Sequence, residues 1–303
     1  MRTKIWASLG AVVIIGGALL YWASLPQTAA LPDLAAHQPD LKNGELLFHA
    51  GGCISCHAPA KDAAGRDPKI PSGGAPLATP LGTLYPPNIT ADKETGIGTW
   101  SDADFVNAMQ HGVSPEGENL IPAFPYTSYR NMTVADVLDI KAYLFSLPPV
   151  KADDPDVGLP LAWFMRHGIG LWKRLALSGT PGRSSTIDPG QSASWNRGAY
   201  LVNGAGHCAE CHTPRNLLMI PKAGQAFAGG PHPSGKGKVP SLRGVIARGD
   251  FQDVDDLAAG LKEGEDGGYD HLTYGGMGEV QKNIAQLPDA DIHAIAEYIA
   301  SLK

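Results

Sequence analysis

The sequence predicts an all-α protein with two tandem domains and long loops, preceded by an N-terminal transmembrane helix. Three observations support this prediction. An apolar run begins near the N-terminus, one pattern occurs twice at a constant spacing, and helix-start signals precede apolar stripes of helical period. With 37 glycines and 25 prolines among 303 residues, we expect the helices to be separated by long loops.

The N-terminal segment, residues 1–30, is expected to be a membrane anchor or a signal. Arg2 and Lys4 precede an apolar run from Ile5 to Leu25, which is long enough to cross a bilayer as a helix. The alternative is a cleavable signal peptide that ends near Thr28-Ala29-Ala30. Because positively charged flanks stay in the cytoplasm, both alternatives export the rest of the chain. We therefore expect a bacterial inner-membrane protein with its N-terminus inside and its domains in the periplasm.

Two copies of one pattern occur in the rest of the chain. Cys53-Ile54-Ser55-Cys56-His57 recurs as Cys208-Ala209-Glu210-Cys211-His212, and residues 141–147 resemble residues 296–302. Positions 53 and 208 are 155 residues apart, and so are positions 143 and 298. Agreement at both ends indicates duplication of a whole domain.

The repeat sets the expected domain boundaries. The first domain is expected at residues 31–150 and the second at 195–303, with a linker at 151–194. The linker contains a possible helix, 159–177, rich in Leu and Trp with three basic residues. We expect this helix to pack between the domains, although a position on the membrane surface is the alternative.

Helices are expected at the start and end of each domain, and no segment alternates as a strand does. The predicted helices are 43–48 with Asn43 as N-cap, 101–111 from Ser101, a helix after the capping box Thr133-Val134-Ala135-Asp136, 196–202, and a helix from Pro288.

The repeated motif predicts covalent haem. Attachment needs two thiols for the two vinyl groups of the porphyrin, and an imidazole that reaches the iron from the same side. Positions i, i+3 and i+4 share one helical face, which is the spacing of both motifs. We predict two covalently bound haem c groups, attached through Cys53, Cys56, Cys208 and Cys211, with His57 and His212 as axial iron ligands.

Other uses of paired cysteines fit less well. Two disulfides would close loops too small to add much stability. A thioredoxin-like pair needs a βαβ context, and a zinc site needs further ligands at set spacings; the sequence shows neither.

Three further stretches resemble one protein family. They are the loop from Pro87 to Phe105, the segment Pro122–Tyr126 and the segment Gly206–Asn216. With them, residues 40–303 are similar to the membrane-bound c-type cytochrome subunits of bacterial periplasmic dehydrogenases, which oxidise alcohols, aldehydes or sugar acids. Well-known members carry three haems, whereas this chain has two attachment sites. The resemblance implies a partner dehydrogenase subunit and a downstream acceptor, either a quinone, a small cytochrome or a terminal oxidase.

The sixth iron ligands differ between the domains. The resemblance places a Met ligand at Met277, on a glycine-flanked segment ahead of the last helix. In the first domain many relatives have Met where this chain has Phe124, which cannot bind iron. Met132 is our tentative substitute, and a packing role for it is the alternative. Arg215 and Arg243 could pair with haem propionates or form surface ion pairs.

The sequence therefore predicts an electron carrier with no substrate dehydrogenase site of its own. A two-haem enzyme that uses an open first haem for peroxide or sulfur chemistry is the alternative, and a gas sensor is a third. The net charge of −6 and the lack of a basic stripe argue against nucleic acid as a partner.

Overall fold

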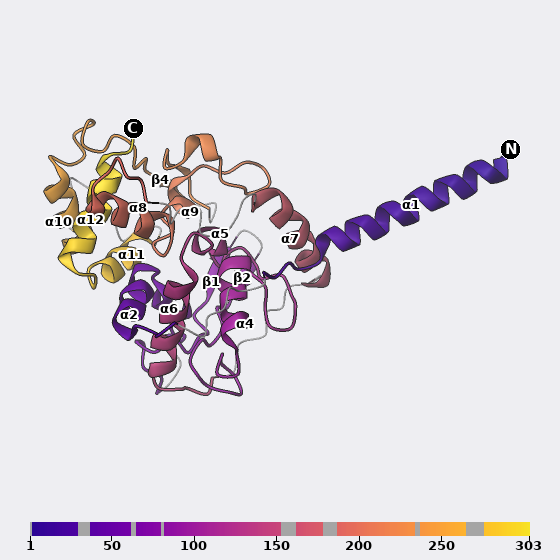
Figure 1. The fold of residues 1–303 in the computed structure, drawn as a ribbon, viewed down its shortest axis with the longest axis horizontal. Coiled ribbons are helices and arrows are strands. Elements are labelled where there is room, and N and C mark those ends of the chain that lie inside the picture. Colours follow the sequence, from indigo (N-terminus) through magenta and orange to yellow (C-terminus); the bar gives the residue numbers. More distant parts are fainter. Residues whose placement is uncertain are drawn as a thin grey trace.

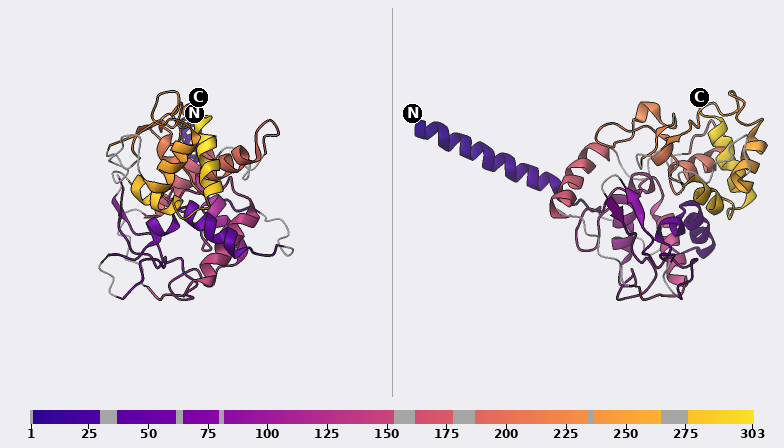
Figure 2. Two further views of the ribbon diagram at one scale, coloured as in Figure 1. Left: turned by 90° about the vertical axis from the view of Figure 1, so that its left-hand side faces the viewer. Right: turned by 180° about the vertical axis from the view of Figure 1, so that it is seen from behind.

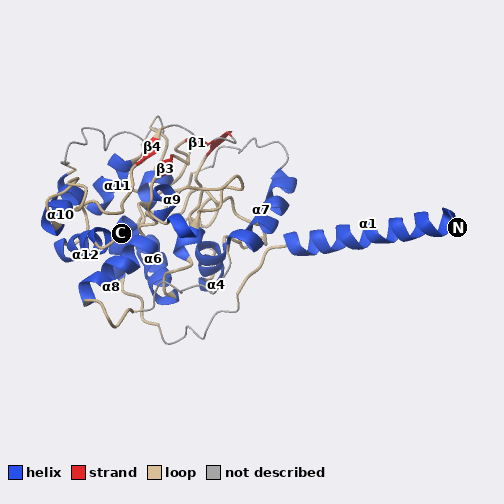
Figure 3. Ribbon diagram, turned by 90° about the horizontal axis from the view of Figure 1, so that it is seen from above, coloured by secondary structure: helices blue, strands red, loops and turns tan. Residues whose placement is uncertain are grey.

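The structure, a computed structural model, describes residues 2–29, 37–61, 65–79, 82–152, 162–177, 187–233, 237–264 and 276–303. The regular secondary structure is mostly helical, and two short antiparallel hairpins are also present (Figures 1 and 3). Strands β1 (Leu77–Thr79) and β2 (Gly82–Leu84) form one hairpin, and β3 (Gly230–Pro231) and β4 (Lys238–Val239) form the other. The all-α prediction is wrong in this respect. Strands of two or three residues are too short to show an alternating pattern.

The N-terminal helix α1 (Arg2–Ser24) projects away from the body of the molecule (Figure 2). Among the residues that the structure describes, no helix is both long and apolar enough to cross a membrane. The expected N-terminal transmembrane helix is therefore wrong. The expectation rested on the length of the apolar run from Ile5 to Leu25.

In the first domain, the opening and closing helices cross at a glycine. These are α2 (Leu41–Ala50) and α6 (Val134–Ser146). A Cβ atom at Gly44 would lie 2.0 Å from the carbonyl oxygen of Asp139 and 2.9 Å from Cβ of Tyr143. Only a residue without a side chain permits so close an approach of the two backbones. The elements between them are α3 (Cys53–His57), α4 (Asp102–Val106), the π-helix η1 (Asn107–His111) and α5 (Tyr126–Tyr129).

The second domain repeats this crossing between α8 (Ala193–Asn203) and α12 (Asp289–Ala300). A Cβ atom at Gly198 would lie 1.8 Å from the carbonyl oxygen of Ala294 and 3.0 Å from Cβ of Tyr298. The remaining elements are α9 (Ala209–His212), the 3-10 turn η3 (Ala223–Gln225), α10 (Val254–Glu263) and α11 (Met277–Ile284). The duplication seen in the sequence thus extends to the way the helices pack.

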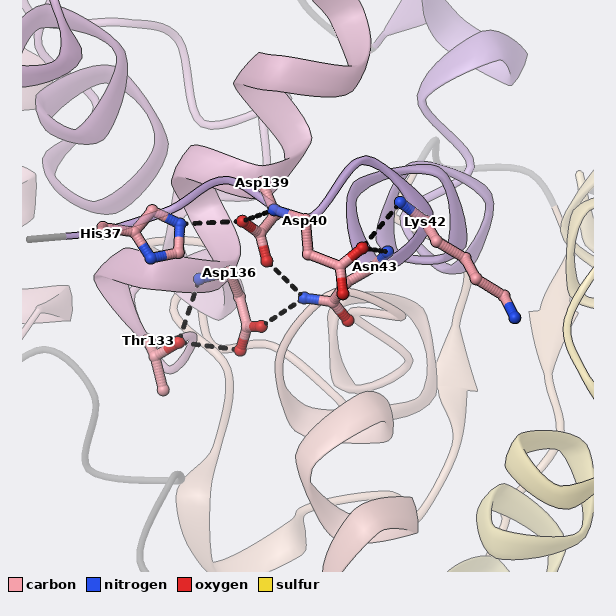
Figure 4. Close-up of polar contacts among 7 residues, drawn as sticks. All are labelled: His37, Asp40, Lys42, Asn43, Thr133, Asp136 and Asp139. Carbon is pink, nitrogen blue, oxygen red and sulfur yellow. Dashed lines mark hydrogen bonds and ion pairs between the residues drawn. The ribbon is translucent and has the colours of Figure 1, made fainter.

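Most helix-start signals are confirmed. Ser101 and Asp104 form a capping box at α4, and the Thr133 hydroxyl accepts a hydrogen bond from the backbone N–H of Asp136. The first cap was placed wrongly, because Asp40 caps α2 in place of Asn43. The Asn43 amide instead donates to the carboxylates of Asp136 and Asp139, each at 2.7 Å (Figure 4). Asn43 therefore ties α2 to α6 rather than starting a helix.

The linker helix α7 (Ala162–Ala176) lies beside the end of α1 and contacts both domains (Figure 1), while its expected packing between the domains stays a prediction. Lys173 Nζ donates to the carbonyl oxygens of His111 and Gly112 in the first domain. Trp172 Nε1 donates to the carbonyl oxygen of Leu218 in the second domain at 2.7 Å. The ring of His167 on α7 also stacks on that of Tyr21 near the end of α1, with centroids 5.5 Å apart. These contacts hold α7 against both domains and against α1.

Candidate functional site

The two Cys-x-x-Cys-His motifs lie on the short helical turns α3 and α9. All four cysteines are free, so the disulfide alternative does not describe this structure. Cys56 and Cys211 are exposed, whereas the thiols of Cys53 and Cys208 face apolar surroundings, and this burial raises their pKa to about 12. Burial therefore favours the neutral, protonated form of these two thiols at neutral pH.

Both motif histidines are held in the same way. His57 Nδ1 donates to the carbonyl oxygen of Pro87 at 2.7 Å, and His212 Nδ1 donates to that of Pro240 at 2.9 Å. Because a carbonyl can only accept, each ring carries its proton on Nδ1 and keeps Nε2 as the basic nitrogen. Burial lowers the pKa of both imidazoles, so they stay neutral, as a metal ligand must.

A turn that contains a glycine hydrogen-bonds to the backbone of each motif histidine. The backbone N–H of Gly73 donates to the carbonyl oxygen of His57, and that of Gly229 donates to the carbonyl oxygen of His212, both at 2.8 Å. Both glycines have a positive φ, 74° and 71°. A Cβ atom at Gly73 would lie 2.5 Å from the backbone nitrogen of Asn88, so a larger residue could not bring these segments together. Both domains therefore hold the backbone of the motif histidine with the same kind of hydrogen bond.

These residues fit haem c. In each domain two free thiols and one neutral, oriented imidazole come from a single helical turn, which is the donor set that covalent haem needs. Near the second motif, Arg215 pairs with Glu210, and its Nε atom is buried without a hydrogen-bond partner. Arg243 Nε donates to the carbonyl oxygen of Ala226 at 2.6 Å. A propionate contact for Arg215 or Arg243 stays a prediction.

Met277, the predicted ligand in the second domain, is the first residue of α11 and is half-buried. The residue before it, Gly276, has a φ of 93°, so the chain turns sharply where the helix starts. Residues 265–275 ahead of this turn lie outside the described part of the chain. The assignment of Met277 as an iron ligand stays a prediction.

Met132, the tentative ligand in the first domain, has 1% of its surface exposed and belongs to the apolar core. Its Cγ atom would lie 3.2 Å from a Cβ atom at Gly204 in the second domain. The corresponding residue one repeat later is Leu287, which is also buried. The assignment of Met132 as an iron ligand stays a prediction, and packing between the domains is the alternative role.

An aromatic cluster surrounds Phe124, at the position where the family resemblance led us to expect Met. Phe124 contacts Tyr126 and Tyr129, with ring centroids 6.4 and 5.5 Å apart. Tyr126 and Tyr129 are buried, and burial raises the pKa of both hydroxyls well above the usual tyrosine range. These side chains therefore form a neutral wall at the first site.

Sequence reasoning missed the carbonyl groups that orient the histidines. Pro87 follows its histidine by 30 residues and Pro240 follows its own by 28. The signal available in the sequence is a proline at nearly the same distance after each motif histidine. Sequence reasoning also missed the positive φ of His207, 38°, directly before Cys208.

Comparison with known proteins supports this reading of the geometry. The cytochrome c family pattern matches residues 41–148 and again 196–303. A diheme cytochrome c-type protein of Cereibacter sphaeroides is 42% identical over 301 residues, covering 99% of this chain and 98% of that protein.

Two longer relatives carry names that state a role. The fructose dehydrogenase cytochrome subunit of Gluconobacter japonicus is 35% identical over 272 residues, or 88% of this chain and 54% of that subunit. The cytochrome c subunit of a quinone-type alcohol dehydrogenase of Gluconacetobacter polyoxogenes is 36% identical over 313 residues, or 99% of this chain and 62% of that subunit. The chain therefore spans little more than half the length of these two relatives.

Proposed function

The chain belongs to the cytochrome c family, and from that premise we propose that it passes electrons from a periplasmic dehydrogenase to the respiratory chain. It is a diheme protein with two covalently bound haem c groups. The observation that carries the proposal is the doubled site: two attachment turns, each with its histidine held by a proline carbonyl.

The protein's own residues have three tasks in this function. The cysteines fix the position of each haem, which supplies the one-electron chemistry when bound. Pro87 and Pro240 fix the histidine rings and make their Nε2 atoms stronger donors to iron. Half-buried Phe124 and the buried Tyr126 and Tyr129 form an aromatic cluster that would limit the access of water to the first haem.

The donor is proposed from the relatives. Similar chains are named as cytochrome subunits of fructose, gluconate and alcohol dehydrogenases, which act on different substrates. Because similar cytochrome subunits serve dehydrogenases with different substrates, we infer that a separate catalytic subunit oxidises the substrate and delivers the electrons. A quinone, a small cytochrome or a terminal oxidase would then receive them.

We place the haem domains in the periplasm, at the outer face of the bacterial inner membrane. The support is the outer surface of α1, where large apolar side chains are more than half exposed: Trp6, Val12, Val13, Ile14, Ile15, Leu19, Leu20, Tyr21 and Trp22. An apolar surface of this extent is unfavourable in water and is expected to be covered by lipid or by a partner subunit.

The test is purification of the tagged protein from its native membranes under mild conditions. We expect a dehydrogenase subunit to co-purify, and the haem absorbance to change from oxidised to reduced when that subunit's substrate is added. A preparation that binds a dehydrogenase but shows no substrate-dependent haem reduction would overturn the proposal.

One observation favours a second candidate, an enzyme that works at an open first haem. Phe124 stands where the family resemblance leads us to expect Met, and a phenyl ring cannot coordinate iron. Peroxide or small sulfur compounds would be its substrates. Rapid oxidation of the reduced protein by peroxide, without any partner, would favour this candidate over electron transfer.

A further inference from the structure

The two haem attachment segments touch each other. A Cβ atom at Gly51, two residues before Cys53, would lie 3.5 Å from the carbonyl oxygen of Ala205, three residues before Cys208. His207 Nε2 donates to the carbonyl oxygen of Gly51 at 3.2 Å. This hydrogen bond directly connects the segment that carries the first haem attachment motif to the segment that carries the second.

His207 has a backbone conformation that its side chain does not favour. Its φ is 38°, and the residue one repeat earlier, Gly52, has a φ of 54°. Glycine adopts this region without strain, whereas a residue with a Cβ does so at a cost. The second domain keeps a histidine where the first has glycine, so the side chain serves a purpose that outweighs the strain.

The ring of His207 also packs against a residue of the first domain. Tyr129 meets it edge-on, with ring centroids 5.9 Å apart. Tyr129 is 4% exposed and shares the apolar core with the half-buried Cys53 and Cys208. The bridge therefore lies against the apolar core, between the attachment turns.

Two reciprocal hydrogen bonds hold this contact in place. Ser128 Oγ of the first domain donates to Glu210 Oε1 in the second motif at 2.8 Å. Asn283 Nδ2 of the second domain donates to Ser55 Oγ in the first motif at 2.8 Å. Ser128 and Asn283 are 155 residues apart, as are Ser55 and Glu210, so each domain clasps the other's attachment turn in the same way.

We propose that electrons pass between the two haem sites across this contact, and that His207 is the positioning residue that bridges it. The inference rests on the proposed function, in which both haems carry electrons. Each step moves one electron: one iron is oxidised from ferrous to ferric, and the other is reduced from ferric to ferrous. No proton or covalent bond is exchanged with the protein.

The test uses the full chain with both haems. A brief pulse of a reducing radical delivers less than one electron per molecule, and absorbance then follows its redistribution between the haems. Redox titration of each variant gives the driving force, so rates are compared at equal driving force. The variants are His207→Gly, which suits the positive φ, and His207→Gln, which keeps a donor of similar reach.

We expect His207→Gly to slow redistribution at least about tenfold while haem content and thermal midpoint stay near wild type, and His207→Gln to restore most of the rate. Met219→Gly is the matched control, since Met219 also has a positive φ, 59°, but lies on an exposed loop. It should leave the rate unchanged. If His207→Gly loses haem, His207→Asn tolerates the same φ and is too short to reach Gly51, and it should be slow in the same way.

A His207→Gly rate within about twofold of wild type, or an equal slowing in Met219→Gly, would overturn the proposal. Neither result concerns the dehydrogenase, because the radical replaces it as donor. Failure of the proposed function would instead appear as haems that redistribute electrons but accept none from a co-purified dehydrogenase.

Discussion

The Nδ1 atom of His57 lies 2.7 Å from the carbonyl oxygen of Pro87, and this contact decides which ring nitrogen is left for iron. His212 and Pro240 repeat it at 2.9 Å in the second domain. Each motif has its own two thiols and its own histidine, so each should keep its haem when the thiols of the other are removed.

Replacing Cys53 and Cys56 together with Ala should remove covalent haem from the first domain alone. We expect the denatured haemochrome assay to fall from two haems per chain to one, because the second turn keeps its own thiols. The matching pair of changes at Cys208 and Cys211 is the control and should give the same value. A count of two in either variant would contradict the assignment.

Met277→Leu should open the iron of the second haem. Leucine keeps the volume of the side chain but has no sulfur, so the reduced variant should bind carbon monoxide. Its reduction potential should fall by on the order of a tenth of a volt or more. Met219→Leu changes an exposed Met in the same way and should alter neither property. A Met277→Leu protein that still excludes carbon monoxide would show that another residue binds the iron.

Met132→Leu applies the same test to the first haem. If Met132 supplies the sixth ligand, the variant gains carbon monoxide binding at this haem, and this is the outcome we expect. The variant should fold normally, because the corresponding residue of the second domain, Leu287, is buried in the same way. An unchanged spectrum and potential would mean that Met132 only packs the domains together.

Gly44→Ala should destabilise the first domain. The added methyl group would lie 2.0 Å from the carbonyl oxygen of Asp139, so α2 and α6 must move apart. We expect the free energy of unfolding to fall by about 3 kcal/mol, measured by denaturant titration. Gly168→Ala on α7 is the control, because nothing lies within 4 Å of its Cβ position. This control should be neutral or stabilising by about 0.5–1 kcal/mol.

Lys173 should make stability depend on pH. Burial lowers its pKa from 10.5 to about 7, so between these values the unfolded chain holds a proton that the folded chain has lost. Stability therefore rises with pH across this window, by up to about 1.4 kcal/mol per pH unit. We expect the free energy of unfolding of wild type to rise relative to Lys173→Met between pH 7 and pH 10. Parallel profiles for the two proteins would contradict this.

Signals that act over a few residues were readable from the sequence. The Ser101 and Thr133 caps start their helices as predicted, since a hydroxyl three residues ahead of an acidic residue fixes the local geometry. The Cys-x-x-Cys-His motifs lie on helical turns for a similar reason, because their spacing acts within one turn of helix. Asp40 displaced Asn43 as a cap because the Asn43 amide finds two carboxylates on α6, a contact that depends on the tertiary fold.

Features that depend on contact between distant segments were not readable. The reciprocal pairs Ser128–Glu210 and Asn283–Ser55 join residues far apart in sequence, and nothing in either segment signals the other. The strands of the two hairpins are only two or three residues long, so they show no alternating pattern in the sequence. For α1, the length of an apolar run was an insufficient guide to a membrane crossing.

Whether this protein is a two-haem electron carrier is best tested by a visible spectrum of the reduced protein with and without carbon monoxide, with haems counted in the same sample. We expect two haems per chain and no spectral change with carbon monoxide, because both irons carry six ligands. Ready binding of carbon monoxide at one haem of undamaged protein, followed by rapid reaction of that haem with peroxide, would rule out a simple carrier and identify an enzyme with an open first haem.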